Sequence, residues 1–114
     1  MNKIIGQKGE DIAAEYLQKE GYTIIERNKH FSKNCEVDII AKHKKTIIFV
    51  EVKTRSTSFL GNPLEAITPT KYQNIKTGAL SYLKESAVKY TNFRIDAISI
   101  ILKPTLSIEH IKNI

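Results

Sequence analysis

Asp38, Glu51 and Lys53 are charged residues within otherwise apolar segments, where charged side chains are uncommon. Asp38 precedes two isoleucines, and Glu51 follows the apolar run of residues 47–50. Carboxylates that meet in an apolar setting repel each other and lose hydration, so they either share a proton or hold a cation. A hard divalent ion such as magnesium, held by one or two carboxylates and water, fits this pattern.

The elements that must position these side chains are two strands, predicted over residues 36–42 and 46–55. A tight basic turn at residues 43–45 joins them, which indicates an antiparallel hairpin. If the turn is centred on its last two residues, Asp38 lies opposite Glu51, with Cβ atoms about 5 Å apart. Two carboxylates at that separation repel by about 3 kcal/mol at an effective dielectric constant near 20. The predicted register therefore calls for a shared proton or a bound cation.

The two faces of this hairpin differ, because side chains alternate along a strand. One face is predicted to be wholly apolar, with the side chains of Val37, Ile39, Ala41, Ile48, Val50 and Val52. The other face is apolar near the turn and becomes charged away from it, with Glu36, Asp38, Glu51 and Lys53. A pattern that is apolar on both sides indicates a central strand covered on both faces.

An alternative without a metal also fits these residues. Glu36 and Lys53 could form a cross-strand ion pair, with Asp38 and Glu51 facing solvent at the edge of a sheet. The apolar flanks of residues 39–40 and 47–50 favour the metal site over this alternative.

The whole chain, residues 1–114, is predicted to form one α/β domain in the order α-β-β-β-α-β-β. Helices are predicted over residues 5–20 and 68–85, and further strands over residues 22–26, 92–102 and 107–111. Residues 30–34 and 61–63 are predicted to be loops. This order gives a layered sheet with helices against it.

The charge favours an anionic partner such as nucleic acid, since the formal net charge is +6 and the isoelectric point is about 9.4. Residues 27–55 alone hold eight basic and three acidic side chains. No apolar run approaches the roughly 20 residues of a membrane span. The first ten residues lack the features of a secretory signal. A single cysteine excludes an internal disulfide, so we expect a cytoplasmic protein.

Four residues invite other chemistry but have simpler explanations. His30, His43 and His110 show no spacing typical of metal ligands and are predicted to lie on the surface. Cys35 has no partner histidine placed by the sequence, and we interpret it as a loop cysteine.

Residues 36–40 and 48–55 together resemble the core signature of the PD-(D/E)XK nuclease superfamily. More narrowly, the chain resembles the small YraN-like family of uncharacterised bacterial proteins, which is distantly similar to archaeal Holliday junction resolvases. Residues 6–10, residues 21–22 and the helix start at residues 69–71 match that family as well. The resemblance covers most of the chain and implies a restriction-endonuclease-like core, a central mixed β-sheet flanked by helices.

The resemblance also implies roles for the site residues. Asp38 and Glu51, with the carbonyl of Val52, would ligate Mg2+, or Mn2+ as a substitute. Lys53 would position or help to deprotonate the attacking water. Glu10 matches an acidic residue that resolvase-like members bring from the first helix, although a helix-start carboxylate favoured by the helix dipole explains it equally well.

The activity implied is metal-dependent hydrolysis of DNA phosphodiester bonds, on branched or structured DNA, by an enzyme that forms a homodimer. Candidate contacts to the nucleic-acid backbone are Arg27, Lys29, Lys33, Arg55, Lys71 and Gln73. Two other functions stay open: a nucleic-acid-binding module that keeps the fold without turnover, and a scaffold for a protein partner. The chain departs from the family where Asn34 and Cys35 replace a glycine before the first motif.

Overall fold

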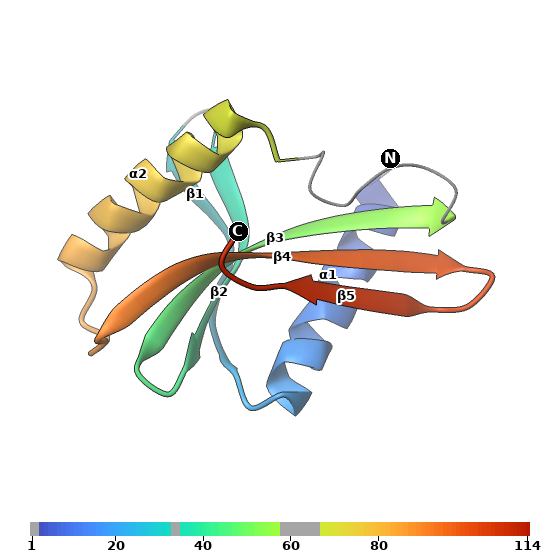
Figure 1. Ribbon diagram of the computed structural model, residues 1–114, viewed down its shortest axis with the longest axis horizontal. Helices are drawn as coiled ribbons and strands as arrows, with labels where there is room; N and C mark the ends of the chain where they lie inside the picture. The colour runs from blue at the N-terminus through green and yellow to red at the C-terminus, as the bar shows by residue number, and fades with distance from the viewer. Residues whose placement is uncertain (1–2, 33–34, 58–66) are drawn as a thin grey trace.

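The computed structural model describes residues 3–32, 35–57 and 67–114. Within these ranges the helices and strands are, in chain order, α1 (Lys3–Lys19), β1 (Thr23–Ser32), β2 (Cys35–His43), β3 (Thr46–Thr57), α2 (Pro69–Glu85), β4 (Asn92–Lys103) and β5 (Ser107–Ile111) (Figure 1). The strands form one sheet in the order β1-β2-β3-β4-β5. β3 and β4 are parallel and the other neighbours are antiparallel. The predicted element order and the mixed sheet flanked by helices are confirmed.

The two helices cover opposite faces of this sheet. Leu17 of α1 packs in one buried cluster with residues of β2 and β3, namely Ile39, Ala41, Ile48 and Val50. Ile75 of α2 packs in a second cluster with Phe49 on the opposite face. β2 and β3 are therefore covered on both sides, which explains why their sequences are apolar runs and not simple alternations.

The β2–β3 hairpin has the predicted register. It turns at Lys44 and Lys45, and Lys44 adopts a left-handed φ of 56°. The recorded ladder runs from the pair His43–Thr46 to the pair Ile39–Val50. Beyond this pair, the amide of Val52, two residues after Val50, donates a hydrogen bond to the Asp38 carboxylate, at 2.7 Å. Asp38 thus lies where pairing of the two strands ends.

Several local predictions are wrong. Val37 packs in the cluster under α2 and not with Ile39 and Ala41 under α1. The alternation breaks beside Asp38, next to a residue of β1 with left-handed backbone, Asn28 (φ 53°). Residues 30–32, expected to be a loop, continue β1 because they pair with the start of β2.

The remaining corrections concern side chains that are buried where the sequence suggested a surface or a loop. Cys35 is the first residue of β2 and is buried. His110 is only 5% exposed and lies 2.7 Å from the fully buried carboxylate of Asp96. Arg94 and the Asn113 amide also donate hydrogen bonds to Asp96. The predicted loop at residues 61–63 lies outside the described residues.

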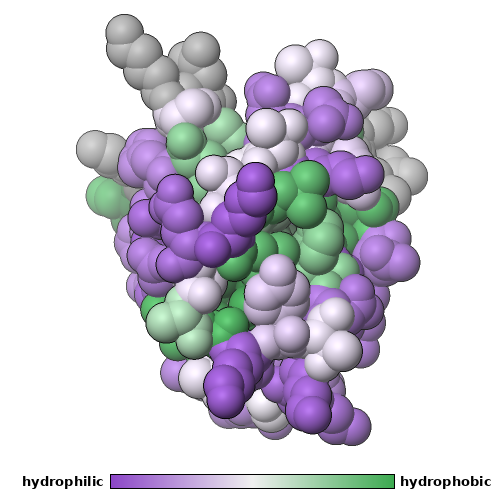
Figure 2. All heavy atoms as spheres, turned by 90° about the vertical axis from the view of Figure 1, so that its left-hand side faces the viewer, coloured by the Kyte–Doolittle hydropathy of each residue, from purple (hydrophilic) through white to green (hydrophobic). Residues whose placement is uncertain are grey.

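Figure 2 shows hydrophobic atoms gathered in a hollow between hydrophilic rims. An open cavity of about 730 Å³ lies where α2 ends and β4 begins, and Leu80, Tyr90 and Phe93 are among its lining residues. Leu80 and Tyr90 are also among the exposed large hydrophobic side chains. In the described part of the chain, neither helix is long and apolar enough to cross a membrane.

Candidate functional site

Asp38 and Glu51 come together at the end of the β2–β3 ladder, as the register predicted. One oxygen of Asp38 accepts the hydrogen bond from the Val52 amide. Glu51 is 8% exposed, and its Oε2 is buried without a hydrogen-bond partner in the described residues. Because a buried carboxylate oxygen without a partner is costly, this oxygen marks a place for a cation or a donor.

The electrostatics of Asp38 reflect the same crowding. Burial and the negative charge of Glu51 raise the pKa of the Asp38 carboxyl to about 8. The hydrogen bond from the Val52 amide opposes this shift, whereas the charge of Glu10 and a hydrogen bond between the Asp38 and Glu51 side chains add to it. Asp38 therefore tends to hold a proton near neutral pH unless positive charge is placed beside it.

Lys71 supplies positive charge at this site. Its Nζ donates a hydrogen bond to Glu51 Oε1 at 2.8 Å. Burial lowers the pKa of Lys71, but its hydrogen bond with Glu51 and the nearby negative charges outweigh this and raise it. The start of α2 positions this residue, since Thr68 caps the helix by accepting a hydrogen bond from the Lys71 amide, and Pro69 occupies the first turn.

The sequence predicts a phosphate contact for Lys71. The cap at Thr68 and Pro69 placed it correctly in the first turn of α2. Its bond to Glu51 depends on how α2 packs across β2 and β1, which no local pattern encodes.

Glu10 approaches from the other helix. Its side chain is 12% exposed, and Arg27 lies 3.3 Å from it in an ion pair. Arg27 also pairs with Asp11 at 2.7 Å. The close approach of α1 to β3 requires Gly9, since a Cβ there would overlap the side chain of Thr54. The third carboxylate thus lies near enough to raise the pKa of Asp38, and Arg27 holds it.

A cavity of about 190 Å³ adjoins Glu51. Its lining residues come from β3, β4 and the start of α2 and are Glu51, Val52, Lys53, Ile67, Lys71, Ala97 and Ile98. Lys53 is exposed in this lining. It does not form the ion pair with Glu36 that the alternative without a metal required, and Glu36 lies 3.4 Å from His30 instead. Two lysines and one carboxylate therefore border the same space.

The donors present fit a hard divalent ion better than a soft one. Within residues 3–32, 35–57 and 67–114, no three His, Cys, Asp or Glu side chains form a metal-binding group. Magnesium is nevertheless commonly held by one or two carboxylates with water and substrate phosphate. Asp38 and Glu51 offer two carboxylates for such a set, and Glu51 Oε2 has no hydrogen-bond partner in the described residues.

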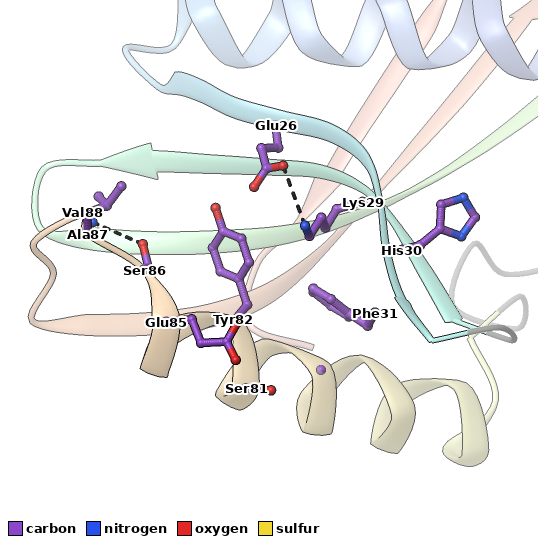
Figure 3. Close-up of a pocket in the computed structure, with 11 residues that line it drawn as sticks. Glu26, Lys29, His30, Phe31, Ser81, Tyr82, Glu85, Ser86, Ala87 and Val88 are labelled. Carbon is purple, nitrogen blue, oxygen red and sulfur yellow. Dashed lines mark hydrogen bonds and ion pairs between the residues drawn. The ribbon is translucent and has the colours of Figure 1, made fainter.

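The predicted nucleic-acid contacts do not form one surface at this site. Arg27 is engaged with two carboxylates of α1. Lys29 lines a separate cavity of about 520 Å³ between β1 and α2, with Glu26 and Tyr82 (Figure 3). Burial and the bond to Glu26 raise the pKa of Tyr82 to about 12.

Two more of the predicted contacts lie elsewhere. Arg55 is partly buried on β3, and Gln73 is exposed on α2 with a hydrogen bond to Thr77. Lys33 lies outside the described residues. Of the predicted contacts that the structure describes, Lys71 alone is in the lining of the cavity beside Glu51.

Comparison with known proteins identifies similar sequences along nearly the whole chain. A sequence model of the uncharacterised protein family UPF0102 matches residues 9–100. A UPF0102 protein of Geobacter sulfurreducens is 47% identical over 114 residues, covering 98% of this chain and 88% of that protein. One of Clostridium botulinum is 46% identical, covering 98% and 94%, and one of Syntrophomonas wolfei is 42% identical, covering 99% and 98%.

Among solved structures, SfsA of Pyrococcus furiosus in complex with Ca2+ is similar at 15% sequence identity, covering 96% of this chain and 63% of that chain. The TM-score is 0.36, which is too low to establish a shared fold.

Proposed function

The chain belongs to the uncharacterised protein family UPF0102, and from this premise we propose that it is a metal-dependent nuclease of the PD-(D/E)XK type that hydrolyses DNA phosphodiester bonds. The observation that carries the proposal is the meeting of Asp38 and Glu51, with the pKa of Asp38 raised to about 8. Two carboxylates placed together under burial are unfavourable in a protein without a counter-charge. A divalent cation between them relieves both the repulsion and the unpartnered oxygen of Glu51.

Asp38 and Glu51, with the Val52 carbonyl, are the residues that would hold magnesium or manganese. When bound, such an ion polarises a phosphodiester and lowers the pKa of a coordinated water. Lys53 borders the cavity beside Glu51, where its ammonium offsets the negative charge that develops on the phosphoryl group. Glu10, held by Arg27, adds a third negative charge beside Asp38 and strengthens the preference for a cation.

The substrate class follows from charge. A formal net charge of +6 favours a polyanion, and contacts to phosphates hold the backbone without reading its sequence. Branched or structured DNA is the substrate we propose, and a homodimer is the form in which we propose that the enzyme acts.

The test is cleavage of duplex and four-way-junction DNA with magnesium, manganese or a chelator. We expect cleavage only with a divalent ion, and we expect Asp38→Ala and Glu51→Gln to reduce it by about a thousandfold or more while DNA binding persists. Glu109→Gln removes an exposed carboxylate of β5 and serves as the matched control.

Cleavage that survives chelation, or that Asp38→Ala leaves intact, would contradict the proposal. Salt-sensitive DNA binding that chelator does not affect, with no product after long incubation, would identify a binding module without turnover. Absence of DNA binding at low salt would favour a protein partner.

A further inference from the structure

Lys71 and Glu51 form an ion pair whose two members differ in exposure. The Lys71 side chain is 42% exposed, whereas that of Glu51 is 10% exposed. If the pair separates, the ammonium regains water easily, but the carboxylate stays in a protein environment and needs another positive charge. The lysine is therefore the member that can leave.

The same ion pair occupies one carboxylate of the proposed metal site. Lys71 bonds Oε1 of Glu51 at 2.8 Å, while Oε2 is buried without a partner in the described residues. Glu51 and Asp38 both contribute to raising the pKa of Lys71, which favours its charged form. A divalent cation and this ammonium would compete for the same negative charge.

Lys71 also borders the cavity of about 190 Å³, and Glu51 is the one carboxylate among the described residues that line it. Lys53 is the other charged side chain there besides Glu51. An ammonium released from Glu51 therefore stays beside a space where a phosphate would meet two lysines.

We propose that Lys71 is a displaceable counter-ion, which holds Glu51 in the metal-free protein and, when a divalent cation binds the carboxylates, is released to bind a DNA phosphate in the adjoining cavity. The inference rests on the proposed function, since it takes Asp38 and Glu51 as the metal ligands. It makes metal binding and DNA binding cooperative, because each favours the state in which Lys71 has left Glu51, and such coupling is reciprocal.

The first measurement is calorimetric titration of the DNA-free protein with manganese chloride. Lys71→Met removes the competing charge and keeps the side-chain length, so manganese should bind about tenfold more tightly, which is about 1.4 kcal/mol. Lys71→Arg keeps the charge and should bind as the wild type does. Lys76→Met, at an exposed position of the same helix, is the matched control and should also leave the affinity unchanged.

The second measurement is DNA binding with and without calcium, followed by fluorescence anisotropy under conditions of no cleavage. Calcium should strengthen DNA binding several-fold more in the wild type and Lys76→Met than in Lys71→Met, since the last has no ammonium to release. Circular dichroism checks the fold, and Lys71→Gln, which is also uncharged, replaces Lys71→Met if that variant does not fold.

These outcomes distinguish the counter-ion role of Lys71 from the metal site itself. Equal manganese affinity in wild type and Lys71→Met, or an equal effect of calcium on DNA binding, overturns the counter-ion role and leaves the proposed nuclease standing. Failure of both proteins to bind manganese at millimolar concentration overturns the metal site itself, and the counter-ion role with it.

Discussion

The pKa of the Asp38 carboxyl depends strongly on the neighbouring groups. Burial, Glu51 and Glu10 all disfavour its ionised form, and the Val52 amide only partly compensates. The pKa of about 8 lies well above 3.8, the ordinary value for an aspartate in an unfolded chain. Between those two values the folded protein binds more protons than the unfolded protein, so stability falls as pH rises through this window.

Asp38→Asn should remove this dependence. In chelator, the free energy of unfolding of the wild type should fall between about pH 5 and about pH 9, relative to that of the variant, by an amount on the order of a few kcal/mol. The melting temperature of the wild type should fall with it. Thermal unfolding followed by circular dichroism measures this. Glu109→Gln should keep the wild-type profile, and parallel profiles for wild type and Asp38→Asn would contradict the assignment.

Magnesium should change that profile in one direction. Metal ligands must be deprotonated, so an added ion should stabilise the wild type more at the alkaline end than at the acidic end. Differential scanning fluorimetry with and without magnesium tests this. An equal shift at both ends would show that Asp38 is not a ligand.

At the scale of elements, α1 reaches the site by close contact with β3. Gly9 is buried against Thr54, which is itself 3% exposed, and leaves no room for a Cβ. The residue that follows it is Glu10, so this contact sets how near the third carboxylate comes to Asp38. Gly6 lies in the same helix, and a Cβ there would meet nothing within 4 Å.

The pair Gly9→Ala and Gly6→Ala makes this a matched test. Gly9→Ala should destabilise the protein by about 1–3 kcal/mol, because overpacking forces α1 away from β3. Gly6→Ala should stabilise it by about 0.5–1 kcal/mol, since alanine is the better helix former. Chemical denaturation measures both, and equal effects of the two substitutions would refute the close contact.

At the scale of the whole molecule, a buried polar network joins the far end of the chain to the core. Asp96 of β4 is fully buried and bonds Arg94, while His110 of β5 lies between Asp96 and Tyr16 of α1. Burial alone would raise the pKa of Asp96, but the hydrogen bonds from His110, Arg94 and the Asn113 amide lower it. Its contribution to stability is therefore present above the unfolded pKa and is lost as pH falls through the folded pKa.

Asp96→Ala should cost about 3–5 kcal/mol of stability, because it leaves buried charge and donors without a partner. Ser99→Ala is the control on the same strand, since its buried hydroxyl has no hydrogen-bond partner in the described residues and its removal should be nearly neutral. Urea denaturation compares the two. A small effect of Asp96→Ala would show that the network contributes little to stability.

Local patterns in the sequence were enough to predict the hairpin and its register. The length of the turn set the register as far as the pair Ile39–Val50, and Asp38 and Glu51 then had to meet one step beyond it. The cap at Thr68 likewise placed the start of α2. These features depend on neighbours within a few residues, so spacing and residue type encode them.

Contacts between segments that are distant in the sequence could not be predicted from it and are seen only in the tertiary structure. The bond between Lys71 and Glu51, the ion pair between Arg27 and Glu10 and the burial of His110 all join separate elements. How helices pack on a sheet depends on the sum of many weak side-chain contacts, and no single motif records it. The pairing of Asp38 with Glu51 could therefore be predicted from the sequence. The ion pair between Lys71 and Glu51 could not, because it depends on how α2 packs against the sheet.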